Sequence, residues 1–446
     1  MRAFVGLGAN LGDRAAALRG ALAALRRLSG TRVTGVSSLY ETEPVGFADQ
    51  PLFYNAAVEL DTELGPGELL ERMQEIEAAA GRRREGPRFG PRELDLDLLL
   101  YGDAVLTEGE LELPHPRLAQ RSFVLVPLAE LSPNLVLPDG RPLRQVLADL
   151  GEVRGVRRRG FLEGLDEGDL PRGEVDRVAR RGLAEDAGRG DLTTRLLVPA
   201  EQLAKAAVVA REPGVVAGLA VAREVFRRAD PELVCTACRR DGEAVAAGEA
   251  LLRLTGRARG ILIGERVALN FLQRLSGIAT DTERAVNLLL GTPARVADTR
   301  KTTPGLRLLE KHAVRAGGGV NHRFALDDLV LIKDNHLLLA GGVRRAVERA
   351  RRGAPFAVRV EVEVETPRQA QEAVAAGADL ILLDNMSPAD LREAVRRVAG
   401  RCPLEASGGV SWDNLAEIGR TGVDFVSMGA LTHSVRALDL SLEVEL

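Results

Sequence analysis

Apolar and polar positions show two kinds of spacing in the first 150 residues, one typical of strands and one typical of helices. Residues 2–7, 33–40, 53–60 and 94–101 are apolar runs of strand length, whereas 13–28 and 68–80 repeat apolar side chains at helical spacing. Asp13 stands where it would cap the first of these helices. The predicted order of strand, helix, strand, strand, helix and strand is typical of the split β-α-β plan.

The composition and the pattern of apolar residues change twice after residue 150. Residues 151–172, GEVRGVRRRGFLEGLDEGDLPR, are rich in glycine and charge, and we expect a linker there. Residues 173–275 mix helices with short strands, such as 206–211 and 251–255. From about 290 an apolar run followed by a helical stretch repeats, with strand ends at ARVADTRK, DLVLIKDN, VRVEVEVE, ADLILLDN, CPLEASGG and VDFVSMGA. The repeat predicts parallel β/α architecture, in which functional groups collect at the C-terminal strand ends.

Composition narrows the class of protein. The 446 residues suggest roughly three domains. With 45% hydrophobic residues and 28% charged residues, the chain is expected to be globular and not disordered. It has no apolar run long enough for a membrane span, and its first residues reach Gly and Asn too soon for a signal peptide, so we expect a cytoplasmic protein with no membrane partner. A net charge of -4 argues against a general nucleic-acid binder.

Three cysteines are too few for a disulfide framework in a chain of this length. Cys235 and Cys238 have the spacing of a zinc knuckle, but no second pair is nearby, so we interpret them as half-buried strand residues.

A first group of charged residues lies between positions 82 and 121. Asp95 and Asp97 alternate along a predicted strand, so their carboxylates share a face and require a cation such as Mg²⁺. The Gly/Pro-rich loop just upstream gathers arginines whose guanidinium groups match phosphate oxygens; these are Arg82, Arg84, Arg88 and Arg92. His115 and Arg121 add a donor and a charge. A solvated strand edge beside a basic surface loop is the plainer alternative.

These residues carry a resemblance. Gly8-Ala9-Asn10, SSLYETEP, DQPLFYNAAV, GPR-x-LDLD and LPHPRL together resemble 6-hydroxymethyl-7,8-dihydropterin pyrophosphokinase over about residues 1–150. The resemblance implies an α+β ferredoxin-like domain that transfers pyrophosphate from ATP to the pterin hydroxymethyl group with Mg²⁺.

The resemblance also implies roles for individual residues. Asp95 and Asp97 would bind magnesium, and the pterin would be surrounded by Thr42, Pro44, Phe53, Asn55 and Phe123. ATP or its phosphates would be faced by Gln74, Glu77, Arg82, Arg84, Arg92, His115 and Arg121. The family often has Ser, Tyr and Trp where this chain has Ala9, Phe53 and Phe89, so we expect altered affinity with activity retained.

A second group of cationic residues follows the later strands. Arg300 and Lys301 follow one predicted strand, His322 and Arg323 follow a Gly-rich turn, Lys333 ends another strand, and Arg266 lies on a helical run. So many positive charges in one cleft require anions, so we expect a dicarboxylate and phosphates. Only four of the 60 basic residues are lysines, and we expect the other two, Lys205 and Lys311, at the surface.

Carboxylates and small residues follow the remaining strands. Glu361, Glu363 and Glu365 alternate and share a face, and Asp384, at the next strand end, could share a Mg²⁺ ion with Glu363. Ser407, Gly408 and Gly429 would expose backbone N–H groups to a phosphate. A tight turn is the alternative for SGG alone.

ERVALNFLQRLSGIAT, DTRKTTPGLR, GGGVNHR, LIKDNH, EVEVE, LLDNM, EASGG and GVDFVSMGALTHS together resemble nicotinate-nucleotide pyrophosphorylase (carboxylating), or quinolinate phosphoribosyltransferase, over about residues 175–446. The resemblance implies an α/β sandwich domain at 173–278, joined by the tail 431–446, and an incomplete β/α barrel at 279–430. It also implies a homodimer or higher homo-oligomer formed through the C-terminal half.

By this resemblance quinolinate and phosphoribosyl pyrophosphate (PRPP) would give nicotinate mononucleotide, CO₂ and pyrophosphate with Mg²⁺. Quinolinate would be held by Arg300, His322, Arg323, Lys333 and a neighbouring subunit's Arg266. Lys301, Glu363 and Asp384 would serve PRPP and its Mg²⁺, and Ser407, Gly408 and Gly429 would hold the 5′-phosphate.

The leading hypothesis is therefore a bifunctional transferase acting on a dihydropterin alcohol and ATP in one half and on quinolinate and PRPP in the other. Three alternatives stay open: residues 1–150 as a non-catalytic pterin-binding or assembly module, the chain as a sensor without turnover, and a related transferase for another planar dicarboxylate or pyridine.

Overall fold

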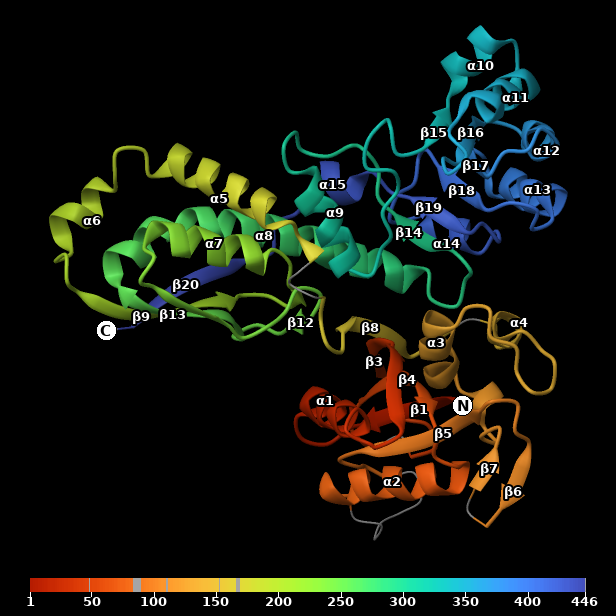
Figure 1. Ribbon diagram of the computed structural model, residues 1–446, viewed down its shortest axis with the longest axis horizontal. Coiled ribbons are helices and arrows are strands. Elements are labelled where there is room, and N and C mark those ends of the chain that lie inside the picture. The colour runs from red at the N-terminus through yellow and green to blue at the C-terminus, as the bar shows by residue number, and fades with distance from the viewer. Residues whose placement is uncertain (48, 83–89, 110, 152, 166–168, 446) are drawn as a thin grey trace. The chain divides into compact units, whose positions relative to one another are not determined.

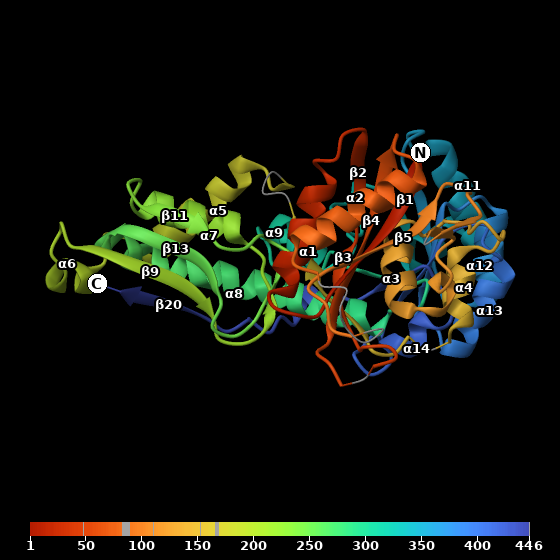
Figure 2. The ribbon, with the colours of Figure 1, turned by 90° about the horizontal axis from the view of Figure 1, so that it is seen from below.

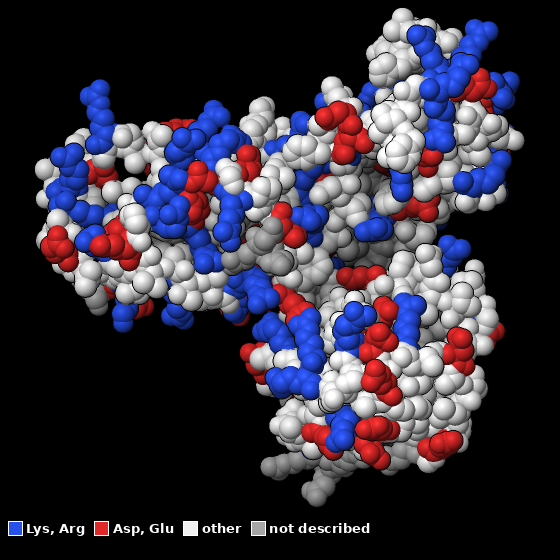
Figure 3. Space-filling model, viewed as in Figure 1, with Lys and Arg blue, Asp and Glu red and all other residues white. Residues whose placement is uncertain are grey.

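The computed structural model describes residues 1–446 except 48, 83–89, 110, 152, 166–168 and 446, and it divides into two compact units, Met1–Glu163 and Gly164–Leu446 (Figure 1). No described helix is long and apolar enough to cross a membrane. On the face drawn in Figure 3, basic and acidic side chains are interspersed over most of the surface of both units.

The first unit is built on one antiparallel sheet in the order β5-β1-β4-β3-β8, with β2 paired to β4. The predicted order of strands and helices is present, except that the single strand expected at 33–40 is divided into β2 and β3. The elements are β1 (Arg2–Ala9), α1 (Arg14–Leu25), β2 (Thr31–Val36), β3 (Ser38–Thr42), β4 (Phe53–Thr62), α2 (Pro66–Ala79), β5 (Asp95–Tyr101), β6 (Leu106–Glu108), β7 (Leu111–Leu113), the 3₁₀ turn Leu118–Gln120, α3 (Ser122–Leu131), α4 (Leu143–Asp149) and β8 (Val156–Phe161).

The core of the first unit lies between one face of this sheet and the helices α1 and α2. Leu18 and Leu22 of α1 and Met73 of α2 pack there with Val5 and other strand residues. Asp13 caps α1 as predicted, since its side chain accepts a hydrogen bond from Ala16 N–H. Helix α3 packs against the sheet through Val124, Leu125 and their neighbours, and the space beside it becomes the site described below.

Strand β8 corrects the linker prediction. Residues 156–161 pair with β3 at the edge of the first sheet, so this part of the segment 151–172 belongs to the first unit. The division between the units falls after Glu163, and α5 begins at Arg172. Arg158 is only 2% exposed, and its Nε donates to Ser38 Oγ. This hydrogen bond explains how an arginine of this charged stretch can be buried in a strand.

The second unit contains an antiparallel sheet, β11-β13-β9-β20, and a parallel sheet, β14-β19-β18-β17-β16-β15. Its elements are α5 (Arg172–Asp186), α6 (Leu192–Leu197), β9 (Leu203–Ala210), β10 (Gly214–Val215), α7 (Leu219–Ala229), β11 (Val234–Ala237), β12 (Ala244–Val245), β13 (Ala250–Arg257), α8 (Ala258–Leu288), β14 (Arg295–Ala297), α9 (Arg307–Ala316), β15 (Val330–Ile332), α10 (Asp334–Ala340), α11 (Val343–Gly353), β16 (Val360–Val364), α12 (Pro367–Ala375), β17 (Leu380–Asp384), α13 (Pro388–Val398), β18 (Leu404–Ser407), α14 (Leu415–Gly419), β19 (Phe425–Ser427), α15 (Ala430–His433) and β20 (Leu440–Glu445).

The chain's last strand returns to the first of these sheets. Strand β20 pairs with β9 from Leu440 to Glu445, and Figures 1 and 2 show the two side by side. The parallel strands are short and mostly buried, and they alternate with the helices from α9 to α14, so side chains that follow each strand meet at one edge of the sheet. The cysteines are free, with Cys235 on β11 partly buried.

Candidate functional sites

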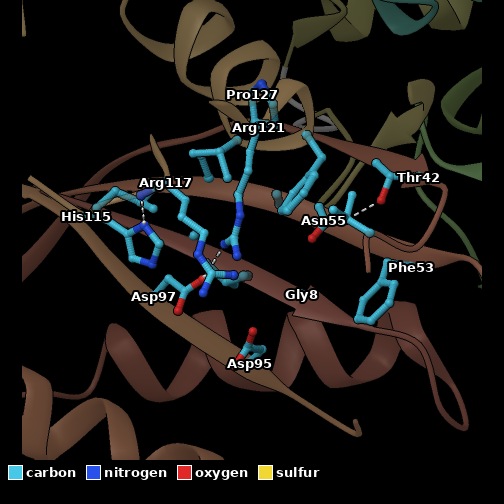
Figure 4. Close-up of a pocket in the computed structure, with 18 of the residues that line it drawn as sticks. Gly8, Thr42, Phe53, Asn55, Asp95, Asp97, His115, Arg117, Arg121 and Pro127 are labelled. Carbon is cyan, nitrogen blue, oxygen red and sulfur yellow. Dashed lines mark hydrogen bonds and ion pairs between the residues drawn. The ribbon is translucent and has the colours of Figure 1, made fainter. Parts of the chain in front are cut away.

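A cavity of about 290 Å³ in the first unit lies between the sheet and α3 (Figure 4). Most of the residues predicted for this half line it, and they come from β3, β4, β5, α3 and the loops between the elements. These residues are Thr42, Phe53, Asn55, Arg82, Arg92, Asp95, Asp97, His115, Arg121 and Phe123. The sequence therefore predicted a real cavity from motifs that are up to 81 positions apart (123 minus 42).

The floor of the cavity is a row of residues across three neighbouring strands. Asp95 on β5 lies opposite Gly8 on β1, and Gly8 lies opposite Asn55 on β4. A Cβ atom on Gly8 would lie 2.9 Å from Asn55 Oδ1, so only glycine leaves the amide in its place. This close approach is the physical reason for glycine in the Gly8-Ala9-Asn10 motif.

Asn55 is fixed by a second buried polar residue. Its Nδ2 donates to Thr42 Oγ1 at 2.7 Å, and both side chains are buried. With one donor engaged by Thr42, the rest of the amide is oriented within the cavity that Phe53 and Phe123 also line (Figure 4). Aromatic faces combined with an oriented amide are suited to a flat heteroaromatic ligand.

Three arginines surround the carboxylate pair. Arg82 Nη1 and Arg92 Nη1 each lie 2.6 Å from an oxygen of Asp95, while Arg121 Nη1 lies 3.8 Å from Asp97 Oδ2. Arg82 and Arg92 thus neutralise Asp95 within the protein. Burial, followed by the neighbouring Asp95 charge, raises the pKa of Asp97 to about 6, and Arg121 opposes this shift. Asp97 therefore lacks full compensation by a cation.

His115 lies on the same wall with its ring facing Arg117 and Arg121 (Figure 4). Burial, followed by the charges of Arg121 and Arg117, lowers the pKa of His115 to about 4. Its Nδ1 accepts a hydrogen bond from Arg117 N–H at 3.2 Å. His115 is therefore a neutral ring near pH 7, with Nε2 carrying the proton.

Some predicted residues are elsewhere. Pro44 and Gln74 are partly buried but do not line the cavity. Glu77 lies behind it, where its carboxylate accepts the Leu96 N–H at 2.7 Å and pairs with Arg82. Arg84, Arg88 and Phe89 lie outside the described residues.

The prediction missed several lining residues. Arg117, Glu43, Gln50 and Pro127 line the cavity. Arg117 lies inside the LPHPRL motif, so proximity to His115 was the signal that could have identified it. Gln50 accepts a hydrogen bond from Asn10 Nδ2 at 3.0 Å, which links two of the quoted motifs.

In the second unit, the predicted residues lie at the C-terminal edge of the parallel sheet. Asp384 and Ser407 are the last residues of β17 and β18 and are paired in register. Lys333 directly follows β15, and Glu363 is the penultimate residue of β16. Gly429 is the N-cap residue of α15, which follows β19. These residues thus lie at the edge of the sheet where the sequence placed them, and their roles stay predictions.

Among the described residues neither Arg300 nor Arg323 forms an ion pair, although the charges of Glu361 and Asp328 act on Arg323. Arg323 is 8% exposed, and burial, followed by the Arg300 charge, lowers its pKa. Among the described residues, Nε of Arg300 is buried and has no hydrogen-bond partner. Two adjacent guanidinium groups, one with an unsatisfied buried donor, make a site for an anion.

His322 faces two buried carboxylates that were not in the predicted site. Its Nε2 lies 3.2 Å from Glu361 Oε2 and 3.3 Å from Glu405 Oε2, and Arg323 N–H donates to its Nδ1 at 2.7 Å. Burial opposes protonation, but the two carboxylates raise the pKa of His322 to about 10. Nδ1 can accept the Arg323 N–H only in the neutral ring, because the protonated ring carries a proton on both nitrogens.

This trio has the donor set of a metal site, yet the hydrogen bonds argue against one. A ring nitrogen that binds a metal must lack a proton, and the other nitrogen then carries it. Because Nδ1 accepts the Arg323 N–H, the proton of a neutral ring is on Nε2, and a protonated ring also carries one there. Nε2 thus carries a proton and faces Glu361 and Glu405 in either state, at ion-pair distance, while neither oxygen of Glu361 has a hydrogen-bond partner among the described residues.

The remaining predicted residues form three local contacts. Lys333 Nζ lies 3.2 Å from Glu363 Oε2. A Cβ atom on Gly408 would lie 2.7 Å from Asp384 Oδ1, and one on Gly429 would lie 3.1 Å from Lys301 Cδ, so both glycines allow close approach.

Arg266 is exposed on α8 and forms no ion pair with any described residue of this site. Lys311 corrects a prediction: it is 3% exposed and pairs with Asp298, whereas Lys205 is exposed as expected. Glu365 lies just beyond β16 and is exposed, so only Glu361 and Glu363 share the strand face.

Comparison with known proteins divides the chain in the same way. Residues 191–276 and 278–443 match family models described as the N-terminal and C-terminal domains of quinolinate phosphoribosyl transferase. Residues 4–133 match the model described as 7,8-dihydro-6-hydroxymethylpterin-pyrophosphokinase (HPPK).

Individual relatives match the second unit. A probable nicotinate-nucleotide pyrophosphorylase [carboxylating] of Bacillus subtilis (strain 168) is 46% identical over 246 residues, which is 55% of this chain and 85% of the relative. The enzyme of that name from Mycobacterium leprae (strain TN) is 45% identical over 260 residues, 57% of this chain and 90% of its own length. The solved structure of the nicotinate-nucleotide pyrophosphorylase from Francisella tularensis has a TM-score of 0.60 and 39% identity, covering 64% of this chain and all of that chain.

Proposed function

The chain belongs to the quinolinate phosphoribosyl transferase family and carries an HPPK domain ahead of it, and on this premise we propose that its second unit converts quinolinate and PRPP to nicotinate mononucleotide, CO₂ and pyrophosphate. One observation carries the proposal. Arg300 and Arg323 lie together at the strand ends, and the buried Nε of Arg300 has no hydrogen-bond partner among the described residues. A ring dicarboxylate supplies the anionic oxygens that this pair requires.

Binding of quinolinate then follows from charge. Arg300, Arg323 and Lys333 hold the two carboxylates, and an unexposed guanidinium is a planar donor suited to a carboxylate. His322 lies beside Glu361 and Glu405, and its ring contacts the backbone N–H of Arg323. Through this contact His322 orients Arg323. Held in this way, the pyridine nitrogen would lie against the anomeric carbon of PRPP.

The reaction needs no general base. The ring nitrogen supplies an electron pair to the anomeric carbon while the bond from that carbon to the pyrophosphate oxygen breaks. The ring is now cationic, and it accepts the electron pair released when the 2-carboxylate leaves as CO₂; a proton from water then occupies C2. Lys301 at the same edge stabilises the charge that develops on the leaving pyrophosphate.

Mg²⁺ fits the oxygen donors at the ends of β16 and β17. Glu363 and Asp384 would hold it, and bound there it would neutralise pyrophosphate oxygens. Ser407, Gly408 and Gly429 would bind the 5′-phosphate, which the absence of Cβ atoms at the two glycines supports.

Arg266 is exposed and apart from these residues, and we infer that it serves the site of another copy in a homodimer or higher oligomer. We infer that this unit consists of an α/β sandwich domain, 173–278 with 431–446, and an incomplete β/α barrel, 279–430.

We further propose that the first unit transfers pyrophosphate from ATP to 6-hydroxymethyl-7,8-dihydropterin. The pterin would lie on Phe53 and Phe123 beside the Thr42–Asn55 pair, and the polyphosphate would face Arg82, Arg92 and Arg121. Asp95 and Asp97 would hold Mg²⁺, and the uncompensated burial of Asp97 supports a cation there. Phosphoryl transfer needs mainly this positioning and neutralisation. The domain is inferred to be ferredoxin-like.

The test uses the full-length chain in two separate incubations. Quinolinate, PRPP and Mg²⁺ should give nicotinate mononucleotide, and ATP with the pterin alcohol and Mg²⁺ should give AMP. Arg300→Ala should abolish the first reaction only and Asp97→Asn the second only. Product from the first incubation alone would leave residues 1–150 as a pterin-binding or assembly module. Turnover of another planar dicarboxylate in preference to quinolinate would establish a related transferase.

A further inference from the structure

We propose that Lys311, acting through Asp298, is a positioning residue that sets the geometry of the quinolinate-binding cations. This inference rests on the proposed function of the second unit and adds a residue to it. Lys311 is on α9 and does not face the substrate side of the site. It binds the segments that carry Arg300 on one side and His322 and Arg323 on the other.

The contact between Lys311 and Asp298 is buried on both sides. Lys311 is 3% exposed and Asp298 is 0% exposed, and the ammonium group forms an ion pair with Asp298 Oδ1. Lys311 Nζ also donates to His322 O at 3.0 Å. A lysine whose ammonium is engaged in this way is not available as an additional cation for the substrate.

Asp298 collects hydrogen bonds from the second segment. Asn321 Nδ2 donates to its Oδ2 at 2.6 Å, and His322 N–H donates to its Oδ1 at 2.9 Å. Asn321 Nδ2 also donates to Lys311 O at 2.9 Å. Asp298 stands two residues before Arg300, so this one carboxylate ties the strand end that leads to Arg300 to the loop that leads to Arg323.

Helix α9 is itself held on three sides, which makes it a rigid support. Glu310 accepts hydrogen bonds from Arg274 Nε at 2.9 Å and from Thr303 N–H at 3.1 Å, and His312 Nε2 lies 2.8 Å from Asp241 Oδ2. Glu310, Lys311 and His312 are consecutive and buried, and each binds a different part of the unit. Lys311 is therefore placed by the helix and not by the loops that it orders.

Replacing Lys311 would leave Asp298 buried without its cation. A buried carboxylate without a partner is costly, so the strand end and the loop would rearrange toward water or toward Arg300. An arginine drawn onto Asp298 is lost to quinolinate. The expected defect therefore falls mainly on quinolinate. Of the residues proposed for PRPP, only Lys301 lies on the segment after β14, and the others lie at or after β16, β17, β18 and β19.

The experiment compares Lys311→Met with Lys205→Met, a matched change at an exposed lysine of the same unit. Kinetics of the full chain should show KM for quinolinate raised about tenfold or more in Lys311→Met, with KM for PRPP within about twofold of the parent. Lys205→Met should leave both within about twofold. Equal rises in both KM values, or no rise, would overturn the inference.

The double variant Asp298→Asn, Lys311→Met separates positioning from folding. It removes both buried charges, so the melting temperature should recover toward the parent value, while KM for quinolinate stays raised about fivefold or more because the bonds from Lys311 to both segments are absent. A double variant with parental KM would show that Lys311 only neutralises Asp298. A parent chain that makes no nicotinate mononucleotide would instead refute the proposed function.

Discussion

Glu363 Oε2 lies 3.2 Å from Lys333 Nζ, so a residue proposed to bind Mg²⁺ and a residue proposed to bind quinolinate pair with each other. The pair links the two halves of the second site. A carboxylate that turns toward Mg²⁺ releases the ammonium group, so loading of PRPP with its metal would free Lys333 for the dicarboxylate.

The first prediction follows from this pair. Glu363→Gln should tighten quinolinate binding in the absence of PRPP, because the ammonium group no longer has an internal partner. The Lys333 side chain is 49% exposed, so the gain is limited to about 1 kcal/mol, or about fivefold. Calorimetric titration without Mg²⁺ measures it. Weaker quinolinate binding in the variant would contradict the idea that Glu363 competes with quinolinate for Lys333. In separate turnover assays, KM for PRPP should rise in the same variant.

A second prediction concerns the buried bond between Asn55 and Thr42. Thr42→Val keeps the shape but removes the acceptor of the Asn55 N–H, which leaves a buried donor unsatisfied at a cost of about 1–3 kcal/mol. KM for the pterin should rise while KM for ATP stays the same. Thr42→Ser, which restores the oxygen, is the control and should recover both the stability and the KM for the pterin.

Tyrosine fluorescence reports the loss of stability of the first unit selectively. The tyrosines Tyr40, Tyr54 and Tyr101 all lie in that unit, and the single tryptophan, Trp412, lies in the second.

The sequence indicated where both proposed sites lie because the residues proposed for them stand in short motifs. Asp95 and Asp97 share a face by strand alternation alone. Lys333 follows β15 and Asp384 ends β17, and the ends of these strands lie at one edge of the parallel sheet. These relations are local, or they follow from the type of architecture.

Partners of buried charges could not be predicted in the same way. Lys311 was assigned to the surface because the residues next to it in the sequence do not indicate a partner. Its partner Asp298 is 13 positions away, and only the fold brings the two together. The carboxylates facing His322 are 39 and 83 positions from it (361 and 405 minus 322). Strand β8 was hidden for a related reason: edge pairing with β3 compensates an arginine-rich segment that shows no apolar run.

Strand β8 gives a third prediction. Arg159 Nε and Nη2 both donate to Glu41 Oε2, at 3.1 and 2.6 Å, whereas the neighbouring Arg157 is exposed. Arg159→Ala should therefore lower the free energy of unfolding of the first unit by about 1 kcal/mol. Arg157→Ala is the matched control and should leave it unchanged. Denaturant unfolding followed by tyrosine fluorescence measures both, and equal effects of the two variants would be inconsistent with an inward role for Arg159.

A fourth prediction uses two groups of opposite sign in the first unit. The pKa of His115 is about 4 in the folded unit against 6.5 ordinarily, so the unfolded chain binds the proton first and stability falls as the pH drops from 6.5 to 4. Asp97 has a folded pKa of about 6 against 3.8, so its contribution is present below 3.8 and is lost as the pH rises through 6.

The two contributions can be separated by variants. When the pH is lowered from 7 to 4, the melting temperature of His115→Asn, followed by tyrosine fluorescence, should fall less than that of the parent. The variant has no proton to take up at this position. Asp97→Asn should fall more, because it loses the group that becomes favourable on acidification. Identical pH profiles for the parent and His115→Asn would show that burial does not hold the ring neutral.

The last prediction concerns the order of bond breaking in the second unit. Decarboxylation of a pyridine 2-carboxylate leaves an electron pair in the ring plane, which a cationic, N-ribosylated ring stabilises and a free pyridine does not. In the proposed site Arg300 and Arg323 would bind the carboxylates in their ionised form, and such binding would stabilise the ground state of free quinolinate rather than its loss of CO₂. Quinolinate labelled at the 2-carboxylate should therefore release no labelled CO₂ when incubated with the chain and Mg²⁺ alone, and should release one equivalent per pyrophosphate once PRPP is added. Quench-flow sampling after addition of PRPP should show pyrophosphate no later than CO₂. Free nicotinate formed before the nucleotide would reverse this order, and the cationic ring would then have no part in the departure of CO₂.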